Sequence, residues 1–65
     1  MTKRKEYAIS RRAEEGREVV DIFEDYDEAQ RMLAEYRMSE RTASYRCTAF
    51  RPANPPRLVR EFLEE

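Results

Sequence analysis

The chain has 65 residues, with a formal net charge of −1, a charged fraction of 42% and a hydrophobic fraction of 40%. A chain this short forms at most one domain, and such a domain buries only about 60% of the surface that its unfolded chain exposes. A single cysteine, Cys47, rules out an internal disulfide, and the lack of histidine argues against a zinc site of the usual nitrogen and sulfur type. We therefore expect one small domain over residues 1–65, without a cofactor or a metal.

The N-terminal part of the sequence predicts a β-hairpin. Residues 1–5 form a short basic arm, and residues 6–12 follow with Tyr7 and Ile9 on one face of an alternating pattern. Such alternation is typical of a half-buried strand. Gly16 is the only glycine of the chain and falls where a hairpin loop needs a residue that adopts positive φ.

The second predicted strand, residues 17–23, is apolar on both sides. Strict alternation places Val19 and Phe23 on one face and Val20 and Ile22 on the other. A strand that is apolar on both sides is usually covered on both sides. We therefore expect two separate covers for this sheet.

The strongest helix signal is DYDEAQRMLAEYRM, residues 25–38. Asp25 suits the N-cap position, and Glu28, three residues later, completes a capping box. The apolar residues recur at helical spacing and form one stripe, made by Tyr26, Ala29, Met32, Leu33 and Tyr36. This stripe predicts a helix that packs on one face of the sheet.

The C-terminal part predicts a third strand and a short helix. Residues 43–50 alternate and form the strand, whose two faces carry Ala43, Tyr45, Cys47 and Ala49, and Ser44, Arg46, Thr48 and Phe50. The linker 51–57 contains all three prolines, which interrupt regular structure. Asn54 suits an N-cap with Pro55 at the first helical position, ahead of a helix over residues 58–65.

These elements predict an α+β domain of ββαβ type with an added C-terminal helix. A right-handed crossover places the third strand beside the first, giving a three-stranded antiparallel sheet of order 2-1-3. The helix over residues 25–38 covers one face. The other face is covered by the C-terminal helix or by a second copy of the chain, and we favour a homodimer because so short a chain has little core.

One charged surface is predicted on the long helix and the residue just before it. The acidic run 24–28 suits a contact with a basic protein surface, or it serves to start the helix, where carboxylates complement the helix dipole. The residues that we expect to bind a protein are Glu24, Asp27, Glu28, Arg31 and Glu35.

A second charged set predicts nucleic-acid binding as the alternative. Arginines on a strand can hold phosphates while neighbouring aromatics, here Tyr45 and Phe50, stack on bases. No RNP-type motif is present, and the sequence pI of about 5.6 does not favour this function. The residues of this alternative set are Arg46, Arg51, Lys3 and Arg4.

The sequence gives no support to an enzymatic function. Cys47 lacks a histidine partner, so the simplest interpretation is a small core residue, and the serines lack a base for the same reason. No apolar run reaches membrane-spanning length, and no signal-peptide core follows Met1. We therefore expect a cytoplasmic protein that does not enter the membrane.

Residues 6–50 resemble the short ββαβ proteins of phages, prophages and their bacterial hosts, above all in EVVDIFEDYDEAQRMLAEYR followed by ASYRCTAF. Some small phage proteins of this size inhibit host defence, including anti-CRISPR proteins. The resemblance implies a binding protein without catalysis and transfers no functional residues to this chain. The expected partner is a host protein or protein complex, met in the host cytoplasm.

Overall fold

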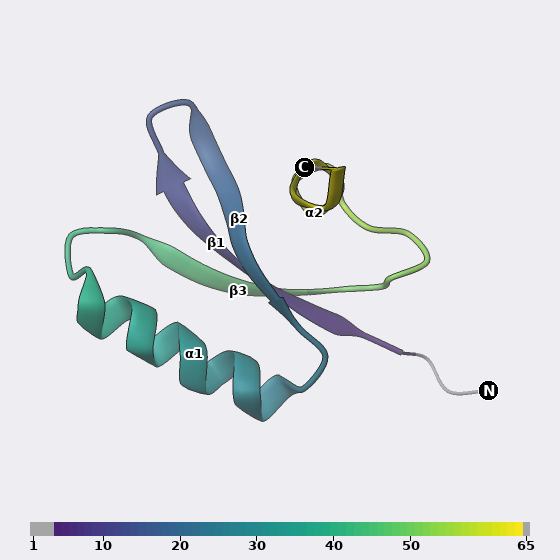
Figure 1. Ribbon diagram of the computed structural model, residues 1–65, viewed down its shortest axis with the longest axis horizontal. Helices are drawn as coiled ribbons and strands as arrows, with labels where there is room; N and C mark the ends of the chain where they lie inside the picture. The colour runs from purple at the N-terminus through teal and green to yellow at the C-terminus, as the bar shows by residue number, and fades with distance from the viewer. Residues whose placement is uncertain (1–3, 65) are drawn as a thin grey trace.

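The computed structural model describes residues 4–64 as three strands and two helices (Figure 1). β1 lies at the centre of the sheet and pairs antiparallel with both of the other strands, in the order β2-β1-β3. The predicted α+β class and the strand order 2-1-3 are therefore confirmed. The elements are β1 (Glu6–Ala13), β2 (Gly16–Phe23), α1 (Tyr26–Ser39), β3 (Tyr45–Phe50) and α2 (Arg57–Glu64).

The start of α1 has the predicted N-cap at Asp25 but only half of the predicted capping box, because within residues 4–64 the side chain of Glu28 makes no return bond to the N–H of Asp25. Asp25 is extended, with φ −104° and ψ 130°, and its carboxylate accepts a hydrogen bond of 2.9 Å from the backbone N–H of Glu28. This bond satisfies one of the free N–H groups of the first turn. The helix begins at Tyr26, ends at Ser39 and buries Ala29 and Leu33 against the sheet.

Substitution of Asp25 by alanine should therefore destabilise the domain by about 1 kcal/mol, because the N–H of Glu28 loses its acceptor. In a domain of this size that loss lowers the thermal midpoint by roughly 4–8 °C. Asp25→Asn is the matched control, since the amide oxygen can still accept the bond. Circular dichroism melting curves measure both variants, and equal loss in the two would contradict the assigned cap.

The hairpin contains an irregularity that the sequence pattern did not reveal. Ile9 pairs with Asp21 and Ser10 pairs with Val19, so Val20 has no partner on β1 and forms a β-bulge. The predicted division of β2 into faces is therefore wrong. Val19 shares a core cluster with Ile22, and Val20 packs in the opposite cluster with Phe23, because the bulge interrupts strict alternation.

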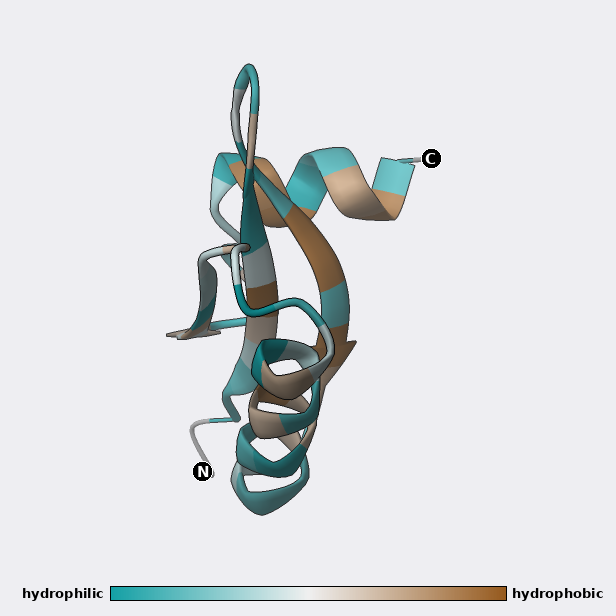
Figure 2. Ribbon diagram, turned by 90° about the vertical axis from the view of Figure 1, so that its left-hand side faces the viewer, coloured by the Kyte–Doolittle hydropathy of each residue, from teal (hydrophilic) through white to brown (hydrophobic). Residues whose placement is uncertain are grey.

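Each face of the sheet has its own small core. Under α1, Leu33 packs with Ile9 and Tyr45, and all three are buried. On the other face, Val59 of α2 packs on a second cluster, which consists of Ala8, Val19 and Phe50. Figure 1 shows α1 running beside the sheet and α2 seen end-on, and Figure 2 shows the C-terminal end of α2 reaching beyond the strands.

The start of α2 differs from the prediction. Asn54 is not its N-cap, because it lies well ahead of the helix in a turn, where its backbone N–H donates to the carbonyl oxygen of Arg51 at 2.9 Å. The helix begins at Arg57, and the N–H of Arg60 donates to the carbonyl oxygen of Pro56 at 3.0 Å. The physical reason is the second proline, which disfavours helical backbone at Pro55.

Coverage of the second face bears on the expected homodimer. Val59 is 1% exposed and Leu58 packs against the same cluster, so α2 supplies the cover that the sequence left open. The argument for a second copy at this face therefore no longer applies, and the homodimer stays a prediction. No helix within residues 4–64 is long and apolar enough to cross a membrane.

Candidate functional site

The residues expected to bind a protein lie together along the outer side of α1. Side chains three or four residues apart share one side of a helix, and Glu24 precedes the first turn in line with them. All of them are exposed. We call this surface the acidic stripe, which consists of Glu24, Asp27, Glu28, Arg31 and Glu35.

Arg4 lies with the acidic stripe and not with the other predicted basic residues. Its guanidinium forms ion pairs with Glu24 and, at 3.6 Å, with Glu6. Exposed pairs of this kind contribute about 0–1 kcal/mol, so the contact places the side chain of Arg4 without holding it strongly. Lys3, the other predicted residue of the arm, lies outside the described residues.

Arg46 lies on the sheet face that α2 also contacts, beside two arginines of the hairpin. Arg46 pairs in register with Ser10, and Arg12 pairs with Arg17 across the hairpin. We call Arg12, Arg17 and Arg46 the arginine cluster. It includes one predicted residue, Arg46, and two that the sequence analysis missed.

The guanidinium of Arg17 is held across the central strand by three oxygens. Its Nε donates to Ser10 Oγ at 3.3 Å, and its Nη2 donates to the carbonyl oxygens of Ser10 at 3.3 Å and Ser44 at 2.9 Å. Ser10 is buried and Arg17 is half-buried, so this arrangement is part of the folded sheet. The positive charge of Arg17, a residue of β2, therefore lies over β1 and toward β3.

The arginine cluster is a region of uncompensated positive charge. Partial burial lowers the pKa of Arg17, and the positive charges of Arg46 and Arg12 lower this pKa further. The ion pairs found within residues 4–64 involve Arg4, Arg11 and Arg57, and none involves a member of the cluster. Three guanidinium groups thus lie together without a described carboxylate partner.

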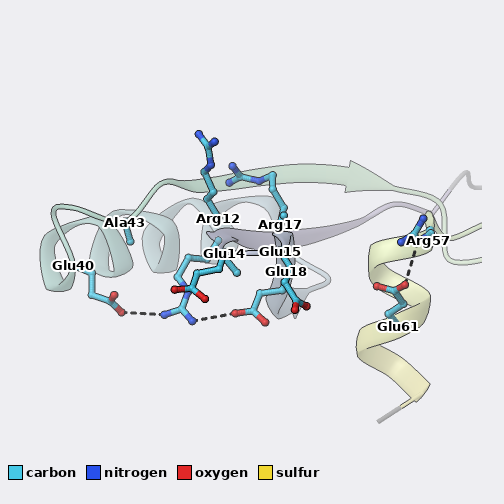
Figure 3. Close-up of a pocket in the computed structure, with 12 residues that line it drawn as sticks. Arg12, Glu14, Glu15, Arg17, Glu18, Glu40, Ala43, Arg57 and Glu61 are labelled. Atoms are coloured by element: carbon cyan, nitrogen blue, oxygen red, sulfur yellow. Dashed lines mark hydrogen bonds and ion pairs between the residues drawn. The ribbon is translucent and has the colours of Figure 1, made fainter.

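On the opposite face of the hairpin, the guanidinium of Arg11 is paired with carboxylates. Arg11 Nη2 lies 3.0 Å from Glu18 Oε1, and its Nη1 lies 3.6 Å from Glu40 Oε1. The hydrogen bond that Arg11 donates to Glu18 makes the largest contribution to raising the pKa of Arg11. Figure 3 shows Arg12 and Arg17 directed away from Glu18 and Glu40, so the two faces of one hairpin present different electrostatic surfaces.

The alternative nucleic-acid set is not brought together on one surface. Arg46 lies near the start of β3, and Arg51 follows its end, five residues further along. At about 3.3 Å per residue, the backbones of the two are roughly 16 Å apart. Tyr45 and Phe50, the aromatics expected to stack on bases, are buried in the two cores.

Cys47 occupies a half-buried position on the α1 side of the sheet, packed against the cluster of Ile9, Leu33 and Tyr45. Burial raises the pKa of its thiol, which lowers the fraction present as nucleophilic thiolate. This environment is that of a small packing residue, as the sequence predicted.

Comparisons with protein-family models, with curated proteins and with solved structures found no match to this chain. The resemblance to short phage ββαβ proteins therefore stays a prediction from the sequence pattern. Functional inference starts from the acidic stripe and the arginine cluster of this chain.

Proposed function

We propose that this chain is a non-enzymatic protein-binding module whose acidic stripe contacts a basic surface of another protein. The observation that supports it most is the position of the stripe on α1. Its four carboxylates and one guanidinium are all exposed, while the opposite side of the same helix is buried. The stripe therefore presents a negative surface on an ordered element.

A helix that is already held in place suits binding. The Asp25 cap holds the first turn and Leu33 anchors the middle of the helix, so contact with a partner orders few additional groups. Preorganisation of this kind reduces the entropy cost of association. Complementary charge mainly raises the association rate and selects among partners.

The kind of partner follows from the sequence resemblance. We propose a host protein or protein complex as the target and, for the role, inhibition of host defence by a phage or mobile element. Binding alone is sufficient for such a role, so no catalytic group is required. The nucleic-acid alternative receives less support, because Arg4 is paired with Glu24 and Arg51 lies apart from Arg46.

The direct test is capture of partners from a bacterial host lysate by the immobilised chain and two charge variants. The variant Glu28→Lys/Glu35→Lys changes the charge of the stripe. Glu14→Lys/Glu15→Lys makes the same charge change in the exposed hairpin turn, where neither residue forms an ion pair with a described residue. Melting curves of all three proteins confirm that each is folded.

We expect one set of proteins to be retained by the unmodified chain and by the hairpin variant, and to be lost from the stripe variant. Equal retention by all three would show that the stripe makes no contact. Recovery of nucleic acid without protein, persisting through washing without nuclease, would replace this proposal with the nucleic-acid alternative.

A further inference from the structure

We propose that Arg12, Arg17 and Arg46 form a binding site for a doubly charged phosphate group, either as the free ion or at the end of a phosphomonoester. The site lies on the hairpin and β3, on a different surface from the acidic stripe. It is therefore independent of the protein-binding function proposed above.

The first argument is that the central guanidinium is already oriented. Three hydrogen bonds to Ser10 and Ser44 hold the Nε and Nη2 sides of Arg17. Within residues 4–64, its Nη1 makes no hydrogen bond, so that edge of the group keeps its donors for a ligand. A ligand at Nη1 would bind without the cost of ordering this side chain.

The second argument is the repulsion within the cluster. Arg12 lies directly across the hairpin from Arg17, and like charges in that position destabilise a sheet. Arg46 adds a third charge from β3 beside Ser10. An anion shared by the three guanidinium groups would replace this repulsion with attraction, which makes its binding favourable in addition to the contacts themselves.

The third argument concerns the shape and charge of the ligand. A carboxylate has two oxygens and one charge, so two guanidinium groups are enough to satisfy it. A phosphate monoester or free phosphate carries about −1.5 to −2 charges near neutral pH and offers at least three acceptor oxygens. Guanidinium groups match such oxygens with paired N–H donors, and three of them can surround one phosphate.

A nucleic-acid strand is a poorer fit to the same cluster. Tyr45 is 4% exposed and Phe50 is 8% exposed, so neither of these β3 aromatics can stack on a base beside Arg46. The three charges also lie in one compact group rather than along a line that would follow successive backbone phosphates. The geometry thus favours one phosphate group over a polymer.

The test is thermal unfolding of the full chain at pH 7.5 in 10 mM sodium phosphate, compared with sodium chloride of equal ionic strength. For a dissociation constant on the order of 1 mM, phosphate should raise the midpoint of the unmodified chain by roughly 5 °C or more. Glycerol 3-phosphate in the same assay distinguishes the sources. An equal or larger shift indicates a phosphomonoester, and a shift with inorganic phosphate alone indicates the free ion.

Arg12 and Arg46 are the exposed members of the arginine cluster, so their substitution tests phosphate binding without unfolding the domain. Arg12→Gln and Arg46→Gln should each lose most of the phosphate shift, and each should melt slightly higher than the unmodified chain without phosphate, because repulsion is relieved. Arg60→Gln removes the same charge from the exposed side of α2, where no ion pair with a described residue is made, and should keep the full shift. The Nε–H resonance of Arg17 in NMR spectra should move on addition of phosphate and stay in place on addition of chloride.

Three results would overturn the proposal. The first is an equal midpoint of the unmodified chain in phosphate and in chloride. The second is a shift in sodium acetate as large as the shift in phosphate. The third is a loss of the phosphate shift in Arg60→Gln that is as complete as in Arg46→Gln. In the first of these cases, binding of a DNA duplex by the same chain would favour recognition of a nucleic-acid backbone in place of this site.

Discussion

Replacement of Leu33 by aspartate is expected to abolish the cooperative thermal unfolding of this domain. Leu33 is 6% exposed and packs on Ile9 and Tyr45 at the centre of the α1 core. The substitution removes apolar contacts and leaves a carboxylate without a partner in that core, which together cost several kcal/mol. A domain of this length has only about 3–10 kcal/mol of stability in total.

Far-ultraviolet circular dichroism and the near-ultraviolet signal of the tyrosines would show the loss of the cooperative transition. Leu63→Asp is the matched control, because it makes the same chemical change at a residue that is 64% exposed. This control should melt within a few degrees of the unmodified chain, as exposed substitutions usually do. A Leu33→Asp protein with an unchanged transition would show that α1 is not packed on the sheet as described.

Replacement of Val59 by aspartate should detach α2 from the sheet. Val59 is 1% exposed, and burying the new carboxylate is more costly than undocking a helix of eight residues. The loss of the apolar contacts of Val59 and Leu58 corresponds to about 3–5 kcal/mol. The midpoint should fall by 10 °C or more.

Detachment should also change the association state, because it uncovers the apolar cluster that includes Ala8, Val19 and Phe50. Light scattering should then report self-association of the Val59→Asp protein and of a shortened chain that ends at Arg51. Leu63→Asp, in the same helix, should behave as the intact chain does. A shortened chain that stays folded, with the same number of copies per particle as the intact chain, would show that α2 is not the cover of this face.

Much of the fold was predictable because its signals are local. Asp25 lies at the correct spacing from Glu28, the apolar stripe through Leu33 repeats every three or four residues, and Gly16 adopts φ 126° in the hairpin turn. These features depend on residues a few positions apart. The right-handed crossover rule then leaves few strand orders to choose from.

The bulge was not predictable, because it depends on how two strands pair and not on residues a few positions apart. Four of the five residues in VVDIF are apolar, so either assignment of faces satisfies the pattern, and only the pairing of Ser10 with Val19 reveals the extra residue. The start of α2 was closer to being predictable. Pro56 restricts Pro55, and that constraint outweighed the capping preference of Asn54.

The acidic stripe was predictable from helical spacing, whereas the arginine cluster was not. Arg12 and Arg17 lie symmetrically about the hairpin turn, so their pairing was within reach of a register prediction. The position of Arg46 beside them depends on which strand neighbours β1 and at what offset. Contacts between residues nearly thirty positions apart, such as Arg17 with Ser44, leave no periodic signal in the sequence.

The bulge at Val20 also shows how this hairpin can change in length. Val20 adds a side chain to the α1 core, while pairing resumes on either side of it, at Ile9 with Asp21 and at Ser10 with Val19. A chain without this one residue would keep the ladder continuous and the arginines of the hairpin opposite each other. Deletion of Val20 should therefore reduce the side-chain volume beneath α1 while Arg12 and Arg17 stay opposite each other, so the interior and the charged surface of this hairpin can be altered separately.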